Sequence, residues 1–147
     1  MFKWKKFGKI FDPTSNNSNE WMQEYAQLPF PYILNDKVIR VYFATRPKSD
    51  SDLKYISRSG YVDLDRKNLT QIINISEKPL FEIGSPGSFD EFGAMTSCFI
   101  NVGKKVYGYY TGWSRLQTVP YTMAIGLAIS SDGGDTFKKI SEGPILG

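Results

Sequence analysis

Short apolar runs rich in valine, isoleucine, tyrosine and phenylalanine alternate with clusters of turn residues along almost the whole chain. Residues of this kind favour strands, and clusters of glycine, proline, asparagine and aspartate favour the turns between them. No amphipathic pattern with helical spacing persists for as long as about three turns. The sequence therefore predicts an all-β fold.

The strand pattern repeats along the chain with a period of about 66 residues. Residues 32–34 correspond to 99–101, 42–46 to 109–113, 60–62 to 126–128, and 76–80 to 141–145. Several matches in register are difficult to explain by chance. We therefore expect two copies of one structural unit.

Each unit is expected to contain four antiparallel strands. In the first unit they span residues 26–34, 38–46, 54–64 and 71–76, and in the second 94–102, 105–113, 121–130 and 137–140. Four-stranded units in tandem are typical of β-propeller blades, so we expect one partial β-propeller domain over residues 1–147. Within it, residues 1–20 would form a strand of the closing blade and a linker, 21–80 the first blade, and 81–147 the second.

Two blades cannot close a ring, and their flanking faces would expose apolar surface. We therefore expect the natural polypeptide to continue past Gly147 or to be completed by another chain. In the second case a homo-oligomer would form through the exposed blade faces.

Composition and charge narrow the possible functions. The 147 residues carry a net charge of +3, which is too small and too scattered for a nucleic-acid partner. The sequence contains no histidine, which excludes a Ser-His-Asp triad and histidine-containing metal sites. No apolar run is long enough to span a membrane, no apolar signal region follows Met1, and Cys98 has no partner for an internal disulfide. We expect a cytoplasmic protein with no membrane partner, no metal and no cofactor, in which carboxylates supply any acid–base chemistry.

Residues 130–137 fit the pattern Ser-x-Asp-x-Gly-x-Thr-aromatic, called the Asp box, which is typical of propellers. In such a hairpin the side chain of Asp132 bonds the turn amides, and glycine supplies a positive φ. The predicted role of Asp132 is structural.

Asp90 and Glu91 precede the first strand of the second blade, where loops of a propeller converge on one mouth. A carboxylate there can bind sugar hydroxyls or act as a general acid or base. Alternatively, the carboxylate caps its own loop in an Asx turn. The spacing leaves both interpretations open.

Six motifs, in their order along the chain, resemble the five-bladed propellers of the arabinanase, levansucrase and invertase superfamily, and within it bacterial proteins similar to glycoside hydrolase family 43. They are residues 4–11, Ala26-Gln27-x-Pro29, Tyr42-Phe43-x-x-Arg46, Gly87-x-Phe89-Asp90, residues 109–113 and residues 125–130. The resemblance spans the whole chain.

The resemblance implies three carboxylates in the funnel, leading into blades one and two and within blade three. Asp90, assisted by Glu91, matches the second position, whereas Leu28-Pro29 replaces the Asp-Pro of the first, with Gln27 and Glu24 nearby. The third carboxylate would lie past Gly147. These departures argue against catalysis by the 147 residues alone more than against carbohydrate binding.

The candidate binding residues are Gln27, Arg46, Trp113 and Arg115. Arg46 and Trp113 occupy matching strand ends of the two repeats. A guanidinium can bind hydroxyls or a carboxylate through a planar fork, and an indole offers an apolar face to a sugar ring.

We therefore expect a carbohydrate partner and a role in acting on a glycosidic bond, by hydrolysis or phosphorolysis. The alternatives are a non-catalytic glycan-binding propeller and a protein-interaction propeller. An acid in blade three, at a distance suited to a carboxylate pair, would separate the first from the second. An apolar funnel without acids would indicate the third.

Overall fold

The computed structural model describes residues 2–16, 19–48 and 56–147, which form two four-stranded antiparallel sheets. The first sheet has the order β1 (Glu24–Ile33), β2 (Val38–Arg46), β3 (Arg58–Asp65), β4 (Ile72–Ile75), and the second β5 (Gly93–Val102), β6 (Lys105–Ser114), β7 (Thr122–Ser130), β8 (Lys138–Lys139). The helix α1 (Pro13–Asn16) has four residues. The all-β prediction with two four-stranded units is confirmed, although residues 54–55 of one predicted strand lie outside the described residues.

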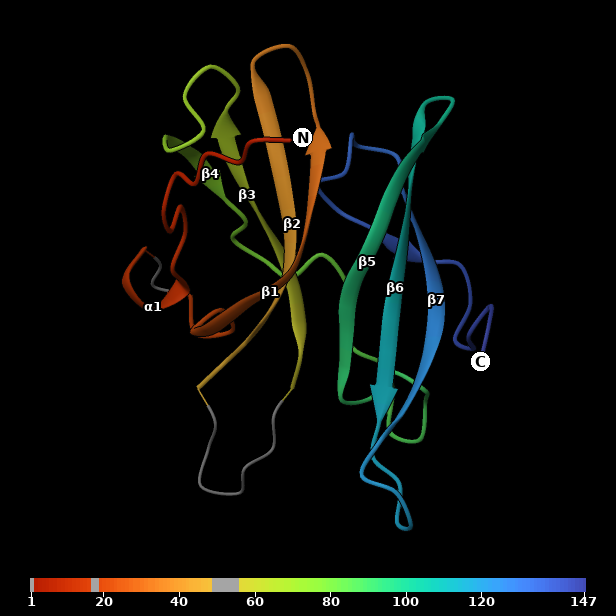
Figure 1. Ribbon diagram of the computed structural model, residues 1–147. Coiled ribbons are helices and arrows are strands. Elements are labelled where there is room, and N and C mark those ends of the chain that lie inside the picture. The colour runs from red at the N-terminus through yellow and green to blue at the C-terminus, as the bar shows by residue number, and fades with distance from the viewer. Residues whose placement is uncertain (1, 17–18, 49–55) are drawn as a thin grey trace.

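The two sheets stand side by side, with β1 and β5 at their facing edges (Figure 1). Tight turns join β1 to β2 and β5 to β6. The side chain of Asn35 accepts hydrogen bonds from the amides of Lys37 and Val38, at 2.8 and 3.1 Å, in the turn between β1 and β2. In the matching turn between β5 and β6, Gly103 has a φ of 62°.

Aromatic side chains fill the space between the sheets. The rings of Tyr42 on β2 and Phe99 on β5 stack with their centroids 3.8 Å apart. Phe137 lies edge-on to both rings, and Phe81, in the connection between the sheets, packs on Tyr110. These rings belong to one apolar cluster shared by both sheets, so burial of aromatic surface holds the sheets together.

A buried arginine adds a polar connection between the sheets. Arg40 on β2 is 2% exposed, and its guanidinium donates to both carboxylate oxygens of Asp63 on β3, at 2.7 and 2.9 Å. The same guanidinium donates to the carbonyl of Gly134 at 2.9 Å and to Asp135 at 2.5 Å, both in the hairpin between β7 and β8. It also lies 3.5 Å from the centroid of the Tyr61 ring. Arg40 thus ties the hairpin of the second sheet to the first.

The hairpin itself is organised around Asp132. Its carboxylate accepts hydrogen bonds from the amides of Asp135 and Thr136 and from the hydroxyls of Ser130 and Thr136. Partial burial opposes ionisation, but these hydrogen bonds outweigh it and lower the pKa of Asp132 from 3.8 to about 2. Gly134 has a φ of 98°, and a Cβ atom there would lie 2.2 Å from the Tyr42 hydroxyl. The identification as an Asp box stays a prediction from the motif.

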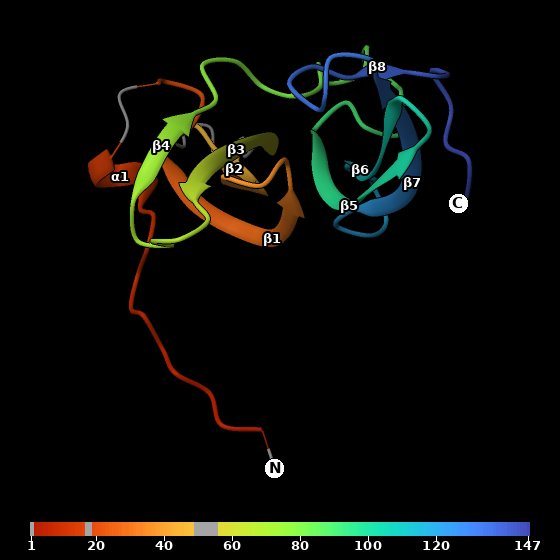
Figure 2. The ribbon, with the colours of Figure 1, turned by 90° about the horizontal axis from the view of Figure 1, so that it is seen from above.

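The first sheet carries a second apolar cluster, on the face opposite to that of Tyr42 and Tyr61. It consists of Met22, Phe43, Val62 and Leu64. Ile10 and Phe11 pack against it, beside an apolar cavity of about 250 Å³. Residues 2–11 form no strand. Ile10 and Phe11 lie on the face of the sheet rather than along its edge, and the residues before them extend away from it (Figure 2). Their proposed place in a closing blade, and self-association through this face, stay predictions.

Replacing Arg40 with Met should strongly destabilise the fold. The substitution leaves the carboxylate of Asp63, which is 5% exposed, without its counter-ion, so we expect a loss of about 3–5 kcal/mol in the free energy of unfolding. Urea denaturation measures it. The same substitution at the more exposed Arg66 should cost less than about 0.5 kcal/mol, and an equal effect at both positions would contradict the assigned role of Arg40.

Acidification should weaken the hairpin through Asp132. The pKa of Asp132 in the folded protein lies below its ordinary value. Its contribution to the free energy of unfolding is therefore fully present above about pH 4 and is lost as the pH falls toward 2. Asp132→Asn should therefore lower stability at pH 7 and flatten its pH dependence between pH 4 and 2, as measured by thermal unfolding across this range. The exposed Asp36→Asn is the control. A variant with the slope of the natural protein would refute this account.

Candidate functional site

One cavity of about 380 Å³ lies where the facing strands of the two sheets begin. At this end Glu24 on β1 pairs with Arg46 on β2, and Gly93 on β5 pairs with Trp113 on β6, which in turn pairs with Met123 on β7. We call this space the inner-strand cavity. Its lining residues are Gln27, Leu28, Arg46, Met95, Trp113, Tyr121 and Met123.

Strand β1 reaches the cavity in an irregular conformation. Tyr25 and Leu28 have φ angles of 64° and 53°, and the register with β2 shifts on both sides of Gln27. A left-handed conformation is costly for bulky residues such as these, so the surrounding structure must hold it. The hydroxyl of Thr45 donates to the carbonyl of Glu24 at 2.9 Å, and that of Thr96 donates to the carbonyl of Leu28 at 3.3 Å.

Trp113 forms an aromatic wall of the cavity. Its ring packs on Phe92 with 5.6 Å between centroids. A Cβ atom on Gly93 would lie 2.3 Å from the indole nitrogen, so the close approach of this ring requires glycine. Ser57 fixes the adjoining backbone, since its amide donates to the carbonyl of Phe92 and its carbonyl accepts from the amide of Ala94.

One arginine lines the cavity, and a second lies over the aromatic residue that supports its wall. Arg46 lines it, and its guanidinium lies 5.7 Å from the centroid of the Tyr25 ring. Arg115 follows β6, and its guanidinium lies 4.9 Å from the ring of Phe92, the residue that supports Trp113. Among the described residues that line the cavity, none carries a carboxylate.

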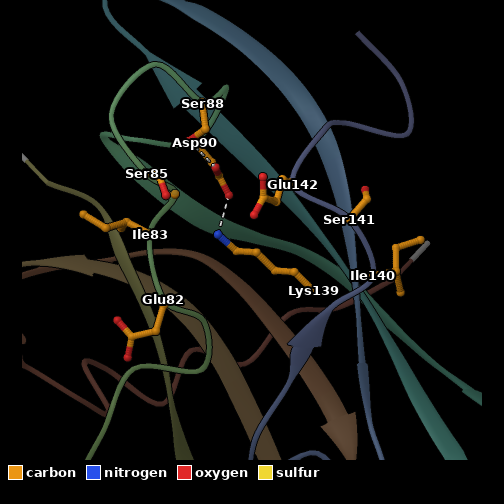
Figure 3. A pocket seen from close by; sticks show the side chains of 10 residues that line it. Glu82, Ile83, Ser85, Ser88, Asp90, Lys139, Ile140, Ser141 and Glu142 are labelled. Carbon is orange, nitrogen blue, oxygen red and sulfur yellow. Dashed lines mark hydrogen bonds and ion pairs between the residues drawn. The ribbon is translucent and has the colours of Figure 1, made fainter.

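Asp90 lines a different pocket of about 400 Å³, between the connection of the two sheets and β8. Its carboxylate is nearly inaccessible, accepts a bond from Ser88 at 3.0 Å and lies 2.5 Å from the ammonium of Lys139. Figure 3 shows these charged groups pointing toward one another from facing segments of the chain. Burial, with a further contribution from the Asp90 carboxylate, raises the pKa of Tyr110 above its usual range.

Asp90 lines this second pocket, whereas Gln27 and Arg46 line the inner-strand cavity. The loop before β5 closes on itself, because the amides of Gly84 and Gly93 both donate to the carbonyl of Asp90. The side chain of Asp90 consequently lies over Gly112 and points toward β8. Glu91 accepts a bond from the amide of Gly87 at 2.7 Å, so it caps the same loop.

The structure therefore brings Gln27, Arg46 and Trp113 together, with Arg115 behind Phe92, and places Asp90 and Glu91 elsewhere. Sequence reasoning missed Leu28, Met95, Tyr121 and Met123 as lining residues. Met123 could have been predicted, because the expected neighbouring strands 105–113 and 121–130 run antiparallel and bring Met123 opposite Trp113. Lys139 carried no such signal, being 49 residues from Asp90.

The described residues contain no group of three or more acidic or cysteine side chains arranged to hold a metal ion. They also contain no helix with the length and apolar character required to cross a membrane.

No family model matches the chain. Uncharacterized proteins from two strains of Mycobacterium tuberculosis are each 32% identical to it over 143 residues, covering 97% of this chain and 45% of their own length. The chain thus spans less than half the length of these relatives.

Solved structures from three bacteria share the fold. A candidate glycoside hydrolase from Parabacteroides distasonis matches 90% of this chain with a TM-score of 0.61 and 22% identity, using 36% of its own length. A candidate glycosidase from Bacteroides thetaiotaomicron matches 86% with a TM-score of 0.60 and 20% identity, using 35%. A glycosyl hydrolase from Bacteroides ovatus matches 90% with a TM-score of 0.59 and 19% identity, also using 35%. The chain has the fold of about a third of each.

Replacing either member of the Asp90–Lys139 pair should destabilise the fold. Asp90→Asn leaves the ammonium without its counter-ion and Lys139→Met leaves a buried carboxylate, so each should cost about 2–3 kcal/mol, with a coupling of about 1–3 kcal/mol in the double variant. Denaturation of all four proteins measures this coupling. Negligible coupling and unchanged stability, with loss of any glycosidase activity that the complete natural protein has, would instead support the predicted catalytic role of Asp90.

Proposed function

We propose that this chain forms two blades of a glycoside-hydrolase-like β-propeller and binds carbohydrate in the inner-strand cavity. The fold shared with three proteins named as hydrolases of glycosides supports this proposal. The five-bladed architecture of the arabinanase, levansucrase and invertase superfamily is its finer part, supported by the order of the sequence motifs. Residues 21–80 and 81–147 would be the two blades.

The convergence of Gln27, Arg46 and Trp113 on one cavity carries the proposal. These residues come from three strands of two sheets. An amide and a guanidinium donate hydrogen bonds to hydroxyl oxygens, and the indole face packs against the apolar C–H face of a sugar ring. A volume of about 380 Å³ lies in the range of small-molecule pockets.

Cleavage of a glycosidic bond requires more than the described lining provides. Glycosidases generally use two carboxylates about 5–9.5 Å apart. The carboxylates of Asp90 and Glu91 face Lys139 and the amide of Gly87 instead. We therefore propose that hydrolysis or phosphorolysis depends on further residues of the natural protein. A catalytic role for Asp90 and Glu91 stays a prediction.

Non-catalytic glycan binding is the second candidate. It is favoured by a lining with hydrogen-bond donors and an aromatic wall but without a carboxylate among the described residues. Release of reducing sugar or sugar phosphate by the complete natural protein would exclude it. Binding without turnover would favour it.

Substitution of Trp113 tests carbohydrate binding. In the complete natural protein, Trp113→Ala should weaken binding of arabino- or fructo-oligosaccharides at least about tenfold, because the stacking surface is lost, whereas Trp113→Phe should retain most of the affinity. Isothermal titration calorimetry measures both, and melting temperatures check that the variants fold. Equal affinity of all three folded proteins would rule out the inner-strand cavity as the binding site.

A further inference from the structure

We infer that Ser57 positions the aromatic wall of the inner-strand cavity by holding the indole N–H of Trp113 through one buried water molecule. Ser57 lies just before β3 of the first sheet, whereas Trp113 belongs to β6 of the second. The water site is argued from the protein alone, and its consequence for ligand affinity rests on the proposed function. The wall is then held by groups of both sheets.

The indole nitrogen of Trp113 is a buried donor that needs an acceptor. Part of the ring lines the cavity, but the nitrogen itself is enclosed and has no hydrogen-bond partner among the described residues. An indole N–H can only donate, and a buried donor without an acceptor destabilises the fold. The indole of Trp21 meets the same requirement within the protein, since its N–H donates to the carbonyl of Glu77 at 3.1 Å.

Ser57 brings a second enclosed polar group to the same place. Ser57 is 1% exposed, and its hydroxyl likewise has no partner in the part of the chain that the structure describes. A Cβ atom on Gly93 would lie 2.3 Å from the indole nitrogen of Trp113 and 2.7 Å from the Cβ atom of Ser57. Both side chains therefore converge on the side of Gly93 that carries no side chain.

Backbone pairing holds Ser57 in this position. Ser57 forms a parallel bridge with Gly93, which in turn pairs with Trp113. The amide of Ser57 donates to the carbonyl of Phe92 at 3.0 Å, and its carbonyl accepts from the amide of Ala94 at 3.3 Å. These contacts fix the separation of the hydroxyl and the indole, which do not bond each other directly.

A water molecule has the chemistry that both groups require. It accepts from the indole N–H, and it exchanges a hydrogen bond with the Ser57 hydroxyl, which can donate or accept. Buried waters commonly bond polar groups that the protein itself leaves unpaired. A sugar hydroxyl does not fit this position, because the two atoms are enclosed by protein. The water would hold the indole of Trp113 in one orientation against the cavity.

NMR of the complete natural protein with isotope-labelled tryptophan tests the water directly. The indole signal of Trp113, identified by its absence from Trp113→Phe, should show a nuclear Overhauser contact with a long-lived water and slow exchange with solvent. In Ser57→Ala the water loses a partner, so the indole hydrogen should exchange at least about tenfold faster. The signal of Trp21, bonded to Glu77, should not change and is the internal reference.

Calorimetry on the same variants tests the positioning role. Because the indole is less firmly held in Ser57→Ala, binding of arabino- or fructo-oligosaccharides should weaken about three- to tenfold. Ser59→Ala is the matched control, since it removes another buried serine hydroxyl, which donates to the carbonyl of Ala94 at 2.6 Å instead. It should lower the melting temperature but leave the Trp113 signal and the affinity unchanged.

The outcomes separate the inference from the proposed function. A Trp113 signal without a water contact, or with the same exchange rate in Ser57→Ala, would overturn the buried water. Unchanged affinity in Ser57→Ala, or an equal loss in Ser57→Ala and Ser59→Ala, would overturn the positioning role. If neither the natural protein nor any variant binds the oligosaccharides at millimolar concentration, carbohydrate binding fails, and the NMR result still decides whether the water is present.

Discussion

The arrangement of the two sheets depends on how the buried charge of Arg40 is satisfied. A guanidinium that is 2% exposed cannot rely on water, so it needs protein acceptors for its N–H groups. Asp63 supplies them within the first sheet, and Gly134 and Asp135 supply them from the second. Aromatic packing between the sheets is strong but weakly directional, whereas these hydrogen bonds specify where the hairpin must lie.

That fixed arrangement creates the inner-strand cavity. Once the sheets are held side by side, the beginnings of β1 and β5 face each other, and the partners of these strands place Arg46 and Trp113 at the same end. The left-handed residues Tyr25 and Leu28 then turn β1 so that Gln27 reaches the lining. The chemistry of the cavity is therefore a property of two sheets together, and neither sheet forms it alone.

The sequence predicted most of the fold because strand periodicity and a repeat are local signals. The strand predicted at 38–46 is β2 (Val38–Arg46), and the one predicted at 105–113 is β6 (Lys105–Ser114). Agreement was poorer for β1 (Glu24–Ile33), predicted at 26–34, where bulges shift the pairing. Arg46 and Trp113 were predictable because the repeat aligns their strand ends, and Gln27 because the resemblance placed it beside Leu28-Pro29 at the entry of the first unit. The position of Asp90 was not, since it depends on the path of one loop and on a lysine in another strand.

The hydrogen-bond partners of Arg40 are synthesised at different times. Asp63 follows Arg40 by 23 residues, whereas Gly134 follows it by 94. During synthesis, which proceeds from the N-terminus, the first sheet can acquire its internal ion pair before the hairpin of the second has been made. The remaining N–H groups of Arg40 must meanwhile be hydrated by water, which the arriving hairpin displaces. Arrival of that hairpin completes the hydrogen bonding of a side chain that belongs to the first sheet.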